Sequence, residues 1–509
     1  MTPQSHSTLF LKNQLETEAF ARRLSLWAKP NTVIALQGDL GSGKSTFARA
    51  FIQALAKSSE PFDIPSPTFP IIQIYDNTRL PVAHVDLYRL SKSEEVAELG
   101  IVELISEHMV LIEWPELISA ALPESTLSLA FSGKDEARSV AITAGGYWLN
   151  ALNRNAIIEN FIANSKWHQA TRLFFEGDAS SRRYESLNLE NQRSLLMDMP
   201  QRPDGPPVQD GKPYSAIAHL AEGISAVVAV NNHLVELGYS APRIGKIDFE
   251  HGLGIIEKFN GQVFGTMMRE GKDMREPLST AVEVLADMAE KPWPQSIELE
   301  NAKRHFIPPY DISAQMIETD LLLSWFWPHI HGTEVGKDLR YSFNEIWRSL
   351  LPKTQATKPQ WVLRDYHSPN LIWMPERKGI ERVGLIDTQD AVMGHAAYDL
   401  ASLLQDARVD VGFDLADQLY DHYAELRTAQ GQFDRQEFSM AFATLGAQRA
   451  TKILGIFARL SKRDGKPGYL MHMPRVSRYL ARNLEHPGLA ALKQWYEAHM
   501  PAALKLGAL

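Results

Sequence analysis

Residues 38–45, with the sequence GDLGSGKS, limit how this chain can fold more than any other segment. They follow the apolar run TVIALQ at 32–37 and have the pattern glycine, four residues, then Gly-Lys-Ser. After them, Phe47, Phe51 and Leu55 recur at helical spacing. A strand, a glycine-rich loop and a helix in this order form a phosphate-binding loop, in which backbone N–H groups surround a phosphate at a helix N-terminus.

Side chains within and beyond this loop complete the expected phosphate site. Lys44 would reach the β- and γ-phosphates of a nucleotide, and Ser45 would bind Mg²⁺. Glu113 follows the apolar run 109–112, so its carboxylate would emerge at a strand end, where it can bind Mg²⁺ or position water. For the loop, the alternative is a chance glycine-rich turn. For Glu113, it is an exposed acid at a strand end. We expect ATP to be held by Gly38, Asp39, Gly41, Ser42, Gly43, Lys44, Ser45 and Thr46.

The bulk composition limits the class of protein. At about 150 residues per domain, a chain of 509 residues holds about three folding units. A hydrophobic content of 44% and a charged content of 22% are those of a globular protein. The net charge of −9 argues against a main role in coating nucleic acid, which depends on Lys and Arg. The chain has no cysteine, no signal-peptide pattern and no apolar run near the ~18 residues of a membrane helix, so we expect a cytoplasmic protein without a membrane partner.

The pattern of apolar residues divides the chain into three parts. Residues 1–150 alternate short β-type runs with helical patterns, which favours a parallel sheet flanked by helices. Residues 151–263 begin with a helical pattern at 153–167. From 171 they hold short strand patterns separated by polar turns, and a further helical pattern over 214–238, as is typical of a small, sheet-rich lobe. Residues 264–509 are dominated by long amphipathic helical patterns and predict a larger helical lobe.

A second group of polar residues indicates another phosphate-transfer centre. The segment LRDYHSPN at 363–370 contains Asp365 and Asn370, and Asp387 follows the apolar run VGLI. Transfer of a γ-phosphoryl group to a hydroxyl requires a carboxylate that accepts the hydroxyl proton, and oxygen ligands for Mg²⁺. Asp365 fits the base, whereas Asn370 and Asp387 fit the metal ligands. The spacing of Asp365 and Asn370 alone is also that of a turn with an Asx cap.

The motifs of the first part resemble those of one family. In chain order they are GDLGSGKST at 38–46, SPTF at 66–69, HVDLYRL at 84–90, ELG at 98–100 and IEWPE at 112–116. This series is similar to that of the TsaE family, the small bacterial ATPases of tRNA threonylcarbamoyladenosine biosynthesis.

The resemblance implies an α/β P-loop NTPase domain that drives or resets a threonylcarbamoyl-transfer assembly. Its partners would be threonylcarbamoyl-transfer subunits of the TsaB and TsaD type, and tRNA would be involved only indirectly. Lys44 and Ser45 would bind phosphate and metal, and Glu113 would be the acidic metal or catalytic group. Thr68 and Asp86 would lie near the nucleotide, with Asp86 among the catalytic residues.

The rest of the chain resembles the aminoglycoside-phosphotransferase and choline-kinase-like superfamily, which is related to protein kinases. Within it, the chain is most similar to the bacterial anomeric kinases of N-acetylmuramate and N-acetylglucosamine. The similarity is carried by EGDASSRRY at 176–184, SLLMDMP at 194–200, IPPYD at 307–311, LRDYHSPNLIW at 363–373, GLIDTQDAVMGHAAYDLASLLQDAR at 384–408 and KILGIFARLSKRDGKPGYL at 452–470.

This second resemblance implies a protein-kinase-like (aminoglycoside phosphotransferase) α+β bilobal domain that uses ATP and Mg²⁺ and takes an amino sugar as its substrate. Asp365 would be the base, and Asn370 and Asp387 would hold Mg²⁺. Backbone groups near 257–259 would serve the adenine.

The small lobe is expected to cover the phosphates with a turn, although the same residues also fit a simple polar hairpin. Where many kinases carry an ATP-pairing lysine, the strand LLMDMP offers Asp198. Leu363 stands where the superfamily usually has a histidine. The turn residues implied by the resemblance are Ser180, Ser181 and Arg182.

Residues 449–482 are rich in Lys and Arg, with aromatic residues between them. Three interpretations are open: a nucleic-acid groove, an anion-binding wall for an acidic sugar, and a solvated helix face.

We therefore interpret the chain as a fusion of a TsaE-like ATPase with a kinase that phosphorylates the anomeric hydroxyl of an amino sugar in cell-wall recycling. A kinase for another small acceptor, such as an aminoglycoside, choline or homoserine, is an alternative, because substrate pockets differ more than phosphate machinery in such folds. A nucleotide-binding scaffold without turnover is a further alternative, and Leu363 is the feature that favours it.

Overall fold

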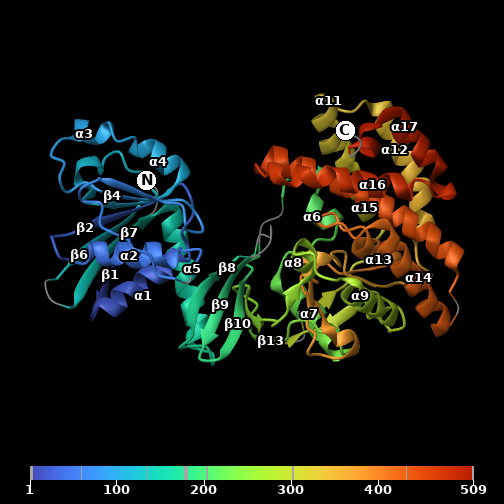
Figure 1. The fold of residues 1–509 in the computed structure, drawn as a ribbon, viewed down its shortest axis with the longest axis horizontal. Coiled ribbons are helices and arrows are strands. Elements are labelled where there is room, and N and C mark those ends of the chain that lie inside the picture. The colour runs from blue at the N-terminus through green and yellow to red at the C-terminus, as the bar shows by residue number, and fades with distance from the viewer. Residues whose placement is uncertain are drawn as a thin grey trace. The chain divides into compact units, whose positions relative to one another are not determined.

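The computed structural model describes residues 4–58, 60–133, 136–176, 182–201, 205–300, 303–431 and 433–506. The chain divides into two compact units: unit 1 comprises residues 1–176 and 184–192, and unit 2 comprises residues 177–183 and 193–509 (Figure 1). Within the described part of the chain, no helix has the length and apolar character needed to cross a membrane.

Unit 1 contains a sheet whose strands lie in the order β1-β7-β6-β2-β5-β4-β3. Strands β6, β2, β5 and β4 run parallel to one another, and β1, β7 and β3 pair antiparallel with their neighbours. The predicted parallel sheet is confirmed in these central strands. The strands are β1 (Gln4–Leu11), β2 (Thr32–Gln37), β3 (Ile72–Tyr75), β4 (Val82–Asp86), β5 (Met109–Glu113), β6 (Leu127–Ser132) and β7 (Arg138–Gly145).

Helices cover both faces of this sheet, because its central strands are apolar on both sides. Buried residues of α1, α2 and α5 pack on one face, and Val96 of α3 and Ile101 of α4 pack on the other. These helices are α1 (Gln14–Ser25), α2 (Lys44–Ala54), α3 (Ser93–Ala97), α4 (Ile101–Glu107) and α5 (Gly146–Ala163).

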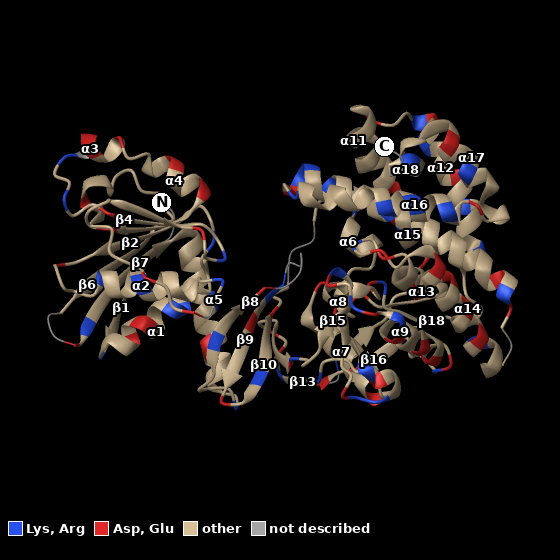
Figure 2. Cartoon of the chain, in the orientation of Figure 1, with Lys and Arg blue, Asp and Glu red and all other residues tan. Residues whose placement is uncertain are grey.

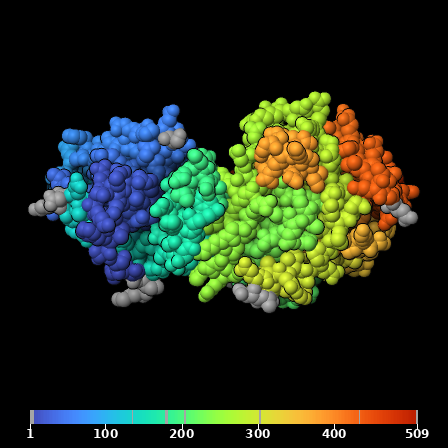
Figure 3. Space-filling view, turned by 90° about the horizontal axis from the view of Figure 1, so that it is seen from below, coloured from blue at the N-terminus to red at the C-terminus, as the bar shows by residue number. Residues whose placement is uncertain are grey.

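Helix α5 crosses residue 150, where the sequence predicts a domain boundary. Trp148 and Ala151 are buried in the core of unit 1, and the Tyr147 hydroxyl donates to the carbonyl of Trp27 at 2.6 Å. In the space-filling view, the teal residues near 150 accordingly lie beside dark-blue N-terminal residues (Figure 3). After α5, strands β8 (Thr171–Phe175) and β9 (Arg183–Leu189) form an antiparallel pair. The predicted boundaries at 150 and 263 stay predictions.

Unit 2 begins with strands and continues mostly with helices, as the apolar pattern predicts. Strands β10, β14 and β13 lie side by side in that order. The elements of this first stretch are β10 (Gln192–Asp198), β11 (Pro207–Gln209), β12 (Lys212–Pro213), α6 (Tyr214–Ile217), α7 (Ile224–Glu236), β13 (Ile244–Asp248), β14 (Leu253–Glu257) and β15 (Gln262–Val263).

The prediction of one helix over 214–238 is wrong, because the chain leaves the helical conformation between α6 and α7. His219 has a φ of 53°, and Gly223 is extended directly before α7. The carbonyls of Ala218 and His219 accept hydrogen bonds from the Arg364 guanidinium at 2.8 and 3.4 Å. A buried side chain from the segment 363–370 therefore binds carbonyls that a continuous helix would use itself.

The helical part of unit 2 packs around short strand pairs that carry the polar motifs. Strand β18 pairs with β21, and β19 pairs with both β15 and β20. The strands are β16 (Ser296–Glu298), β17 (Arg304–Phe306), β18 (Gln360–Val362), β19 (Leu371–Trp373), β20 (Val383–Leu385) and β21 (Val392–Gly394). The helices are α8 (Phe264–Arg269), α9 (Arg275–Met288), α10 (Ile312–Leu321), α11 (Trp327–His331), α12 (Lys337–Leu350), α13 (Ala397–Leu404), α14 (Phe413–Gln430), α15 (Arg435–Asp464), α16 (Met473–Asn483), α17 (Ala490–His499) and α18 (Ala502–Lys505).

Candidate functional site

The glycine-rich loop of unit 1 joins the end of β2 to the start of α2. Gly38, Gly41 and Gly43 all have positive φ, at 127°, 77° and 107°. A Cβ atom at Gly38 would lie 2.2 Å from the carbonyl oxygen of Phe131, so only glycine fits at this position. The predicted strand, loop and helix are therefore present, with Lys44 as the first residue of α2.

Lys44 is folded back onto its own loop. Its Nζ donates to the carbonyls of Gly38 and Asp39 at 2.6 and 2.9 Å, and it lies 4.0 Å from the centre of the Trp114 ring. Burial lowers the pKa of Lys44, although the carboxylates of Glu113 and Asp86 act in the opposite direction. An ammonium group that is shared by neutral carbonyls is available to a stronger anionic ligand such as a phosphate.

Two carboxylates lie opposite the loop, at the ends of the neighbouring strands β5 and β4. Ser45 Oγ donates to Glu113 Oε2 at 3.0 Å, and Thr68 Oγ1 donates to Asp86 Oδ2 at 2.8 Å. Asp86 and Glu113 are register partners in the parallel pair β4 and β5. The structure thus brings together the predicted residues Lys44, Ser45, Thr68, Asp86 and Glu113.

His84, a buried histidine of this site, was not identified from the sequence. His84 Nε2 lies 2.9 Å from Glu113 Oε1, and both side chains are almost fully buried. Because side chains alternate along a strand, His84 and Asp86 point to the same side of β4. Their spacing of two residues in HVDLYRL is the signal from which His84 could have been predicted. His84 fixes one oxygen of Glu113 and leaves the other facing Ser45.

The remaining residues of the loop face a cavity or stabilise the turn. The backbone N–H of Ser42 donates to the carbonyl of Asp39 at 3.2 Å. A cavity of about 440 Å³ beside the start of α2 is lined by Gly43 and Thr46, with Thr17 and Arg138 among its other walls. This space adjoins the C-terminal end of the glycine-rich loop.

In unit 2 the segment that holds Asp365 has a backbone fixed by a buried carboxylate. Asp399 of α13 accepts hydrogen bonds from the backbone N–H of Leu363 at 2.6 Å and of Arg364 at 2.9 Å. Burial raises the pKa of Asp399 to about 7, and these backbone hydrogen bonds oppose the rise. Arg364 has a φ of 65°, an unfavourable conformation for a residue with a side chain. Asp399, which sequence reasoning missed, holds the loop in this shape.

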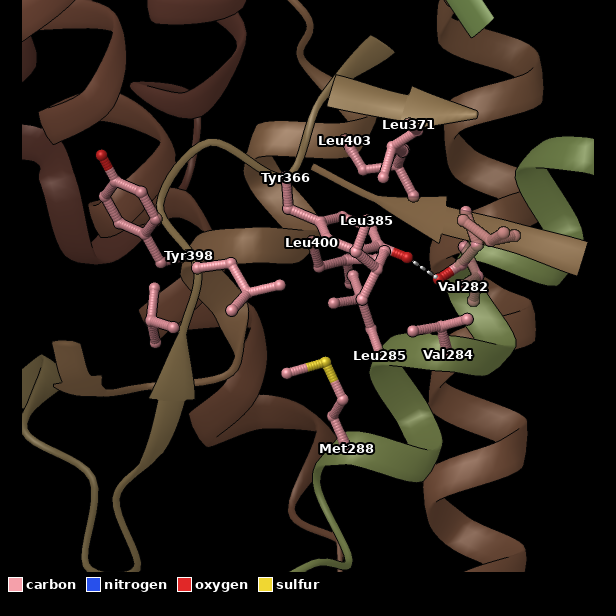
Figure 4. Close-up of a cluster of buried hydrophobic side chains, with 14 of the residues drawn as sticks. Val282, Val284, Leu285, Met288, Tyr366, Leu371, Leu385, Tyr398, Leu400 and Leu403 are labelled. Atoms are coloured by element: carbon pink, nitrogen blue, oxygen red, sulfur yellow. Dashed lines mark hydrogen bonds between the residues drawn. The ribbon is translucent and has the colours of Figure 1, made fainter. Parts of the chain in front are cut away.

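Tyr366 anchors the same loop from its other side. Its ring is buried among apolar side chains of α9, β19, β20 and α13, and its hydroxyl donates to the carbonyl of Ala281 at 2.9 Å (Figure 4). Leu363 is also buried, with 2% of its surface exposed. Leu363, which stands in place of the usual histidine, therefore adds an apolar anchor to the loop. Asp365 lies between the buried residues Arg364 and Tyr366, which fix its position.

Asp365 itself is accessible, with 44% of its side chain exposed. His367 Nε2 lies 3.9 Å from Asp365 Oδ1, and Asn370 Nδ2 donates to the backbone carbonyl of Asp365 at 3.0 Å. Partial loss of solvation opposes ionisation, but electrostatic interactions with His367, Lys452 and Arg364 outweigh it and lower the pKa of Asp365. The carboxylate is therefore ionised at neutral pH, as a general base must be.

Asn370 and Asp387 are brought together by the strand pair β19 and β20. Asn370 directly precedes β19, and its backbone carbonyl accepts a hydrogen bond from Ile386 at 3.1 Å. Asp387, two residues beyond β20, has a φ of 61°. Because the Nδ2 atom of Asn370 donates to the carbonyl of Asp365, its Oδ1 atom is the side-chain oxygen left to accept a hydrogen bond or bind a metal. Hydrogen bonds thus join the segments that hold Asp365, Asn370 and Asp387.

Arg182 lies over this group. Its guanidinium donates to the carboxylate of Asp387, and to Gln389 Oε1 at 2.6 Å. Ser180 and Ser181, the other predicted turn residues, lie outside the described residues. Glu257, the first residue of the segment 257–259 predicted to serve adenine, is the last residue of β14, and Arg377 Nη2 lies 3.2 Å from its Oε1 atom.

A buried ion network lies behind the Asp365 loop. Glu318 of α10 accepts hydrogen bonds from Arg364 and Tyr310, and from Lys452 Nζ at 2.7 Å. Burial raises the pKa of Glu318, but Lys452 and Arg364 outweigh burial and bring it down to about 2. Sequence reasoning did not single out Glu318, because a lone acid within an amphipathic helix carries no signal.

The cations of residues 449–482 have mostly structural partners. Arg449 donates to the carbonyl of Gln405 at 3.1 Å, Arg475 donates to that of Ala407 at 3.0 Å, and Arg478 pairs with Asp410 at 2.9 Å. Figure 2 shows acidic as well as basic residues along the helices of this unit. Most of these cations thus bind carbonyl or carboxylate oxygens of the same unit.

Comparisons with known proteins divide the chain in the same way as its motifs. The profile of the family described as threonylcarbamoyl adenosine biosynthesis protein TsaE matches residues 11–140, and that of the phosphotransferase enzyme family matches residues 171–437. The N-acetylmuramate/N-acetylglucosamine kinase of Caulobacter vibrioides is 33% identical over 357 residues, which cover 68% of this chain and 97% of that protein.

Two relatives match the N-terminal part. The tRNA threonylcarbamoyladenosine biosynthesis protein TsaE of Rickettsia bellii is 41% identical over 118 residues, 23% of this chain and 81% of that protein. The TsaE protein of Rickettsia felis is 38% identical over 128 residues, 25% of this chain and 74% of that protein. The chain therefore belongs to the TsaE family through its N-terminal part and to the phosphotransferase enzyme family through the remainder.

Proposed function

We propose that this chain is a bifunctional, ATP-dependent protein. Its N-terminal part would hydrolyse ATP in support of threonylcarbamoyladenosine modification of tRNA. Its C-terminal part would transfer the γ-phosphoryl group of ATP to the anomeric hydroxyl of N-acetylmuramate or N-acetylglucosamine. The convergence of Asp365, Asn370 and Asp387 in a chain related to kinases of these two sugars is the observation that carries the second assignment.

In the N-terminal part, we assign phosphate binding to the loop 38–46 and to Lys44. Lys44 would exchange the carbonyls of Gly38 and Asp39 for phosphate oxygens. Glu113, fixed by His84, would hold the metal with Ser45 or orient the attacking water. Asp86, held by Thr68, would supply the second carboxylate of the site.

In the C-terminal part, Asp365 would accept the proton of the anomeric hydroxyl while that oxygen attacks the γ-phosphorus. A bond forms between the sugar oxygen and phosphorus, the bond to the β-phosphate oxygen breaks, and ADP leaves. The products are a sugar 1-phosphate and ADP. Arg182 would leave Asp387 and neutralise phosphate charge, which fits the presence of Asp198 in the place of the usual lysine.

The polar residues of both sites fit Mg²⁺, which prefers oxygen ligands and neutralises triphosphate charge when bound. In unit 2 the ligands would be Asp387 and the Oδ1 atom of Asn370, and in unit 1 they would be Ser45 and Glu113.

The wider setting belongs to the same proposal. The partners of the N-terminal part would be threonylcarbamoyl-transfer subunits of the TsaB and TsaD type, with tRNA involved only indirectly. The location would be the cytoplasm. The functional division would lie near residue 150, with kinase lobes at 151–263 and 264–509. The relationship to N-acetylmuramate/N-acetylglucosamine kinases favours an amino sugar over an aminoglycoside, choline or homoserine, and favours turnover over a silent scaffold.

The replacement Lys44→Ala tests whether the two activities are separate. Because it removes the charge that faces the phosphates, ATP hydrolysis without a sugar acceptor should fall by about 10²- to 10³-fold. Sugar phosphorylation by the same full-length variant should be unchanged.

Lys57→Ala is the matched control, since Lys57 is an exposed residue whose ammonium donates to the carbonyl of Asp76. Both activities should survive this change. Equal ATP hydrolysis by wild type and Lys44→Ala would contradict the assignment of the N-terminal site.

A further inference from the structure

A cavity of about 650 Å³ lies within unit 2. Its walls come from the segments around β11, β12 and α6, from α10 and the helical residues Leu322–Phe326 that continue it, and from the C-terminal half of α15. This volume is in the range of small-molecule sites. Six of its lining residues carry the argument: Tyr214, Ala221, Leu321, Trp325, Arg459 and Arg463.

The cavity adjoins the loop that holds Asp365. The backbone N–H of Ala221, in the cavity wall, donates to Asp390 Oδ1 at 2.6 Å. Asp390 lies three residues after Asp387, and the carboxylates of Asp365 and Asp387 both act on it. The Arg364 guanidinium, one residue before Asp365, donates to the carbonyl of Ala218. The cavity wall is thus linked to the segment that holds Asp365 through Asp390 and Arg364.

Arg459, on helix α15, is a cation of this wall. Among the residues that the structure describes, no carboxylate forms a salt bridge with it. It lies two helical turns beyond Lys452 on α15, and its guanidinium is 5.5 Å from the centre of the Tyr214 ring. Its Nε is buried and has no hydrogen-bond partner among the residues that the structure describes. Burial lowers the pKa of Arg459, and Arg463 acts in the same direction, whereas Tyr214 and Asp464 act in the opposite one.

The other charges near the cavity have partners or face solvent. Arg463 pairs with Asp464 at 2.7 Å, and Lys452 pairs with Glu318 at 2.7 Å. Asp320, an acid in the wall, forms a salt bridge with Arg340, and Glu222 is exposed. Of the two cations in this wall, Arg463 therefore has a salt bridge, whereas Arg459 forms none with the residues that the structure describes.

We propose that Arg459 binds the carboxylate of an acidic amino sugar in this cavity, and that it favours N-acetylmuramate over N-acetylglucosamine. The inference rests on the proposed function of unit 2 and adds its substrate class. The two sugars differ by the lactyl ether of N-acetylmuramate, whose carboxylate is an anion that a planar guanidinium can bind through two N–H groups. The indole of Trp325 and the ring of Tyr214 supply apolar walls for the sugar.

The first test uses the wild-type, full-length protein and needs no substitution. N-acetylmuramate and its methyl ester have nearly the same shape, but only the acid carries a charge. A charge-assisted hydrogen bond is worth about 1.5–3 kcal/mol, so the KM of the ester should be about 10- to 100-fold higher, with kcat little changed. Equal KM values for acid and ester would overturn the inference.

The second test combines the substrates with variants of Arg459. Arg459→Gln should raise the KM for N-acetylmuramate by about 10- to 100-fold and leave the KM values for N-acetylglucosamine and for the methyl ester unchanged. Arg459→Lys, which keeps the charge, should restore part of the loss. Arg478→Gln is the matched control, because Arg478 is an exposed residue that pairs with Asp410.

The outcomes separate this inference from the proposed function. If wild type phosphorylates both sugars and Arg459→Gln weakens both equally, Arg459 has only a structural role and the inference alone fails. If wild type phosphorylates neither sugar, the proposed function fails and the inference falls with it.

Discussion

Replacing Asp365 with asparagine should lower kcat for sugar phosphorylation by about 10²- to 10⁴-fold, the range that a positioned general base contributes. The amide is close in shape to the carboxylate, but it does not accept a proton at neutral pH. The loop itself should keep its structure, because Asp399 and the buried Tyr366 hold it through other groups. Steady-state kinetics with ATP and either amino sugar would measure the loss.

Two controls accompany this prediction. Asp338→Asn, an exposed residue of α12, should leave sugar phosphorylation unchanged. ATP hydrolysis at the N-terminal site of the Asp365→Asn protein should equal that of wild type, and an unchanged urea unfolding transition of unit 2 would show that the substituted unit is intact. Sugar phosphorylation above a tenth of the wild-type rate would mean that Asp365 is not the base.

Replacing Glu318 with alanine should lower the free energy of unfolding of unit 2 by about 3–5 kcal/mol. The change leaves Arg364 and Lys452 buried with their shared carboxylate removed. Urea unfolding followed through tryptophan fluorescence would show the shift, with the transitions of the two units fitted separately. Glu345→Ala, which breaks an exposed pair with Arg348, should cost at most about 1 kcal/mol. A loss of similar size in both variants would contradict the role of the buried network.

The same glutamate predicts how stability depends on pH. Its pKa is about 2 in the folded chain and 4.5 by its ordinary value. A carboxylate whose folded pKa is lowered stabilises the fold fully above its unfolded pKa, and this contribution is lost as pH falls through the folded value. Unit 2 should therefore lose stability from pH 5 down to about pH 2, and Glu318→Gln should show a smaller part of this loss.

Local patterns in the sequence were sufficient to predict the backbone of both sites. The P-loop requires glycines with positive φ between an apolar strand and a helix, and these requirements can be read over a few residues. The acid that ends β5 and the acid that follows β20 could be predicted because strand ends direct side chains toward one edge of a sheet.

Groups that act through tertiary contacts could not be predicted in this way. Asp399 holds the Leu363 and Arg364 amides from a helix distant in sequence, and Glu318 finds its partners only after α10 and α15 pack together. The helix predicted over 214–238 is interrupted for the same reason, because Arg364 binds carbonyls that helical propensity alone would pair internally. Each of these contacts joins segments that no local window contains.

The most direct test of the account is to identify the product that the full-length protein forms from ATP, Mg²⁺ and N-acetylmuramate or N-acetylglucosamine. Phosphorus NMR would detect coupling of the new phosphate to the anomeric proton. The account predicts a sugar 1-phosphate together with one ADP for each phosphate transferred. Phosphate on another hydroxyl, or no sugar phosphate from a protein that still hydrolyses ATP, would contradict it.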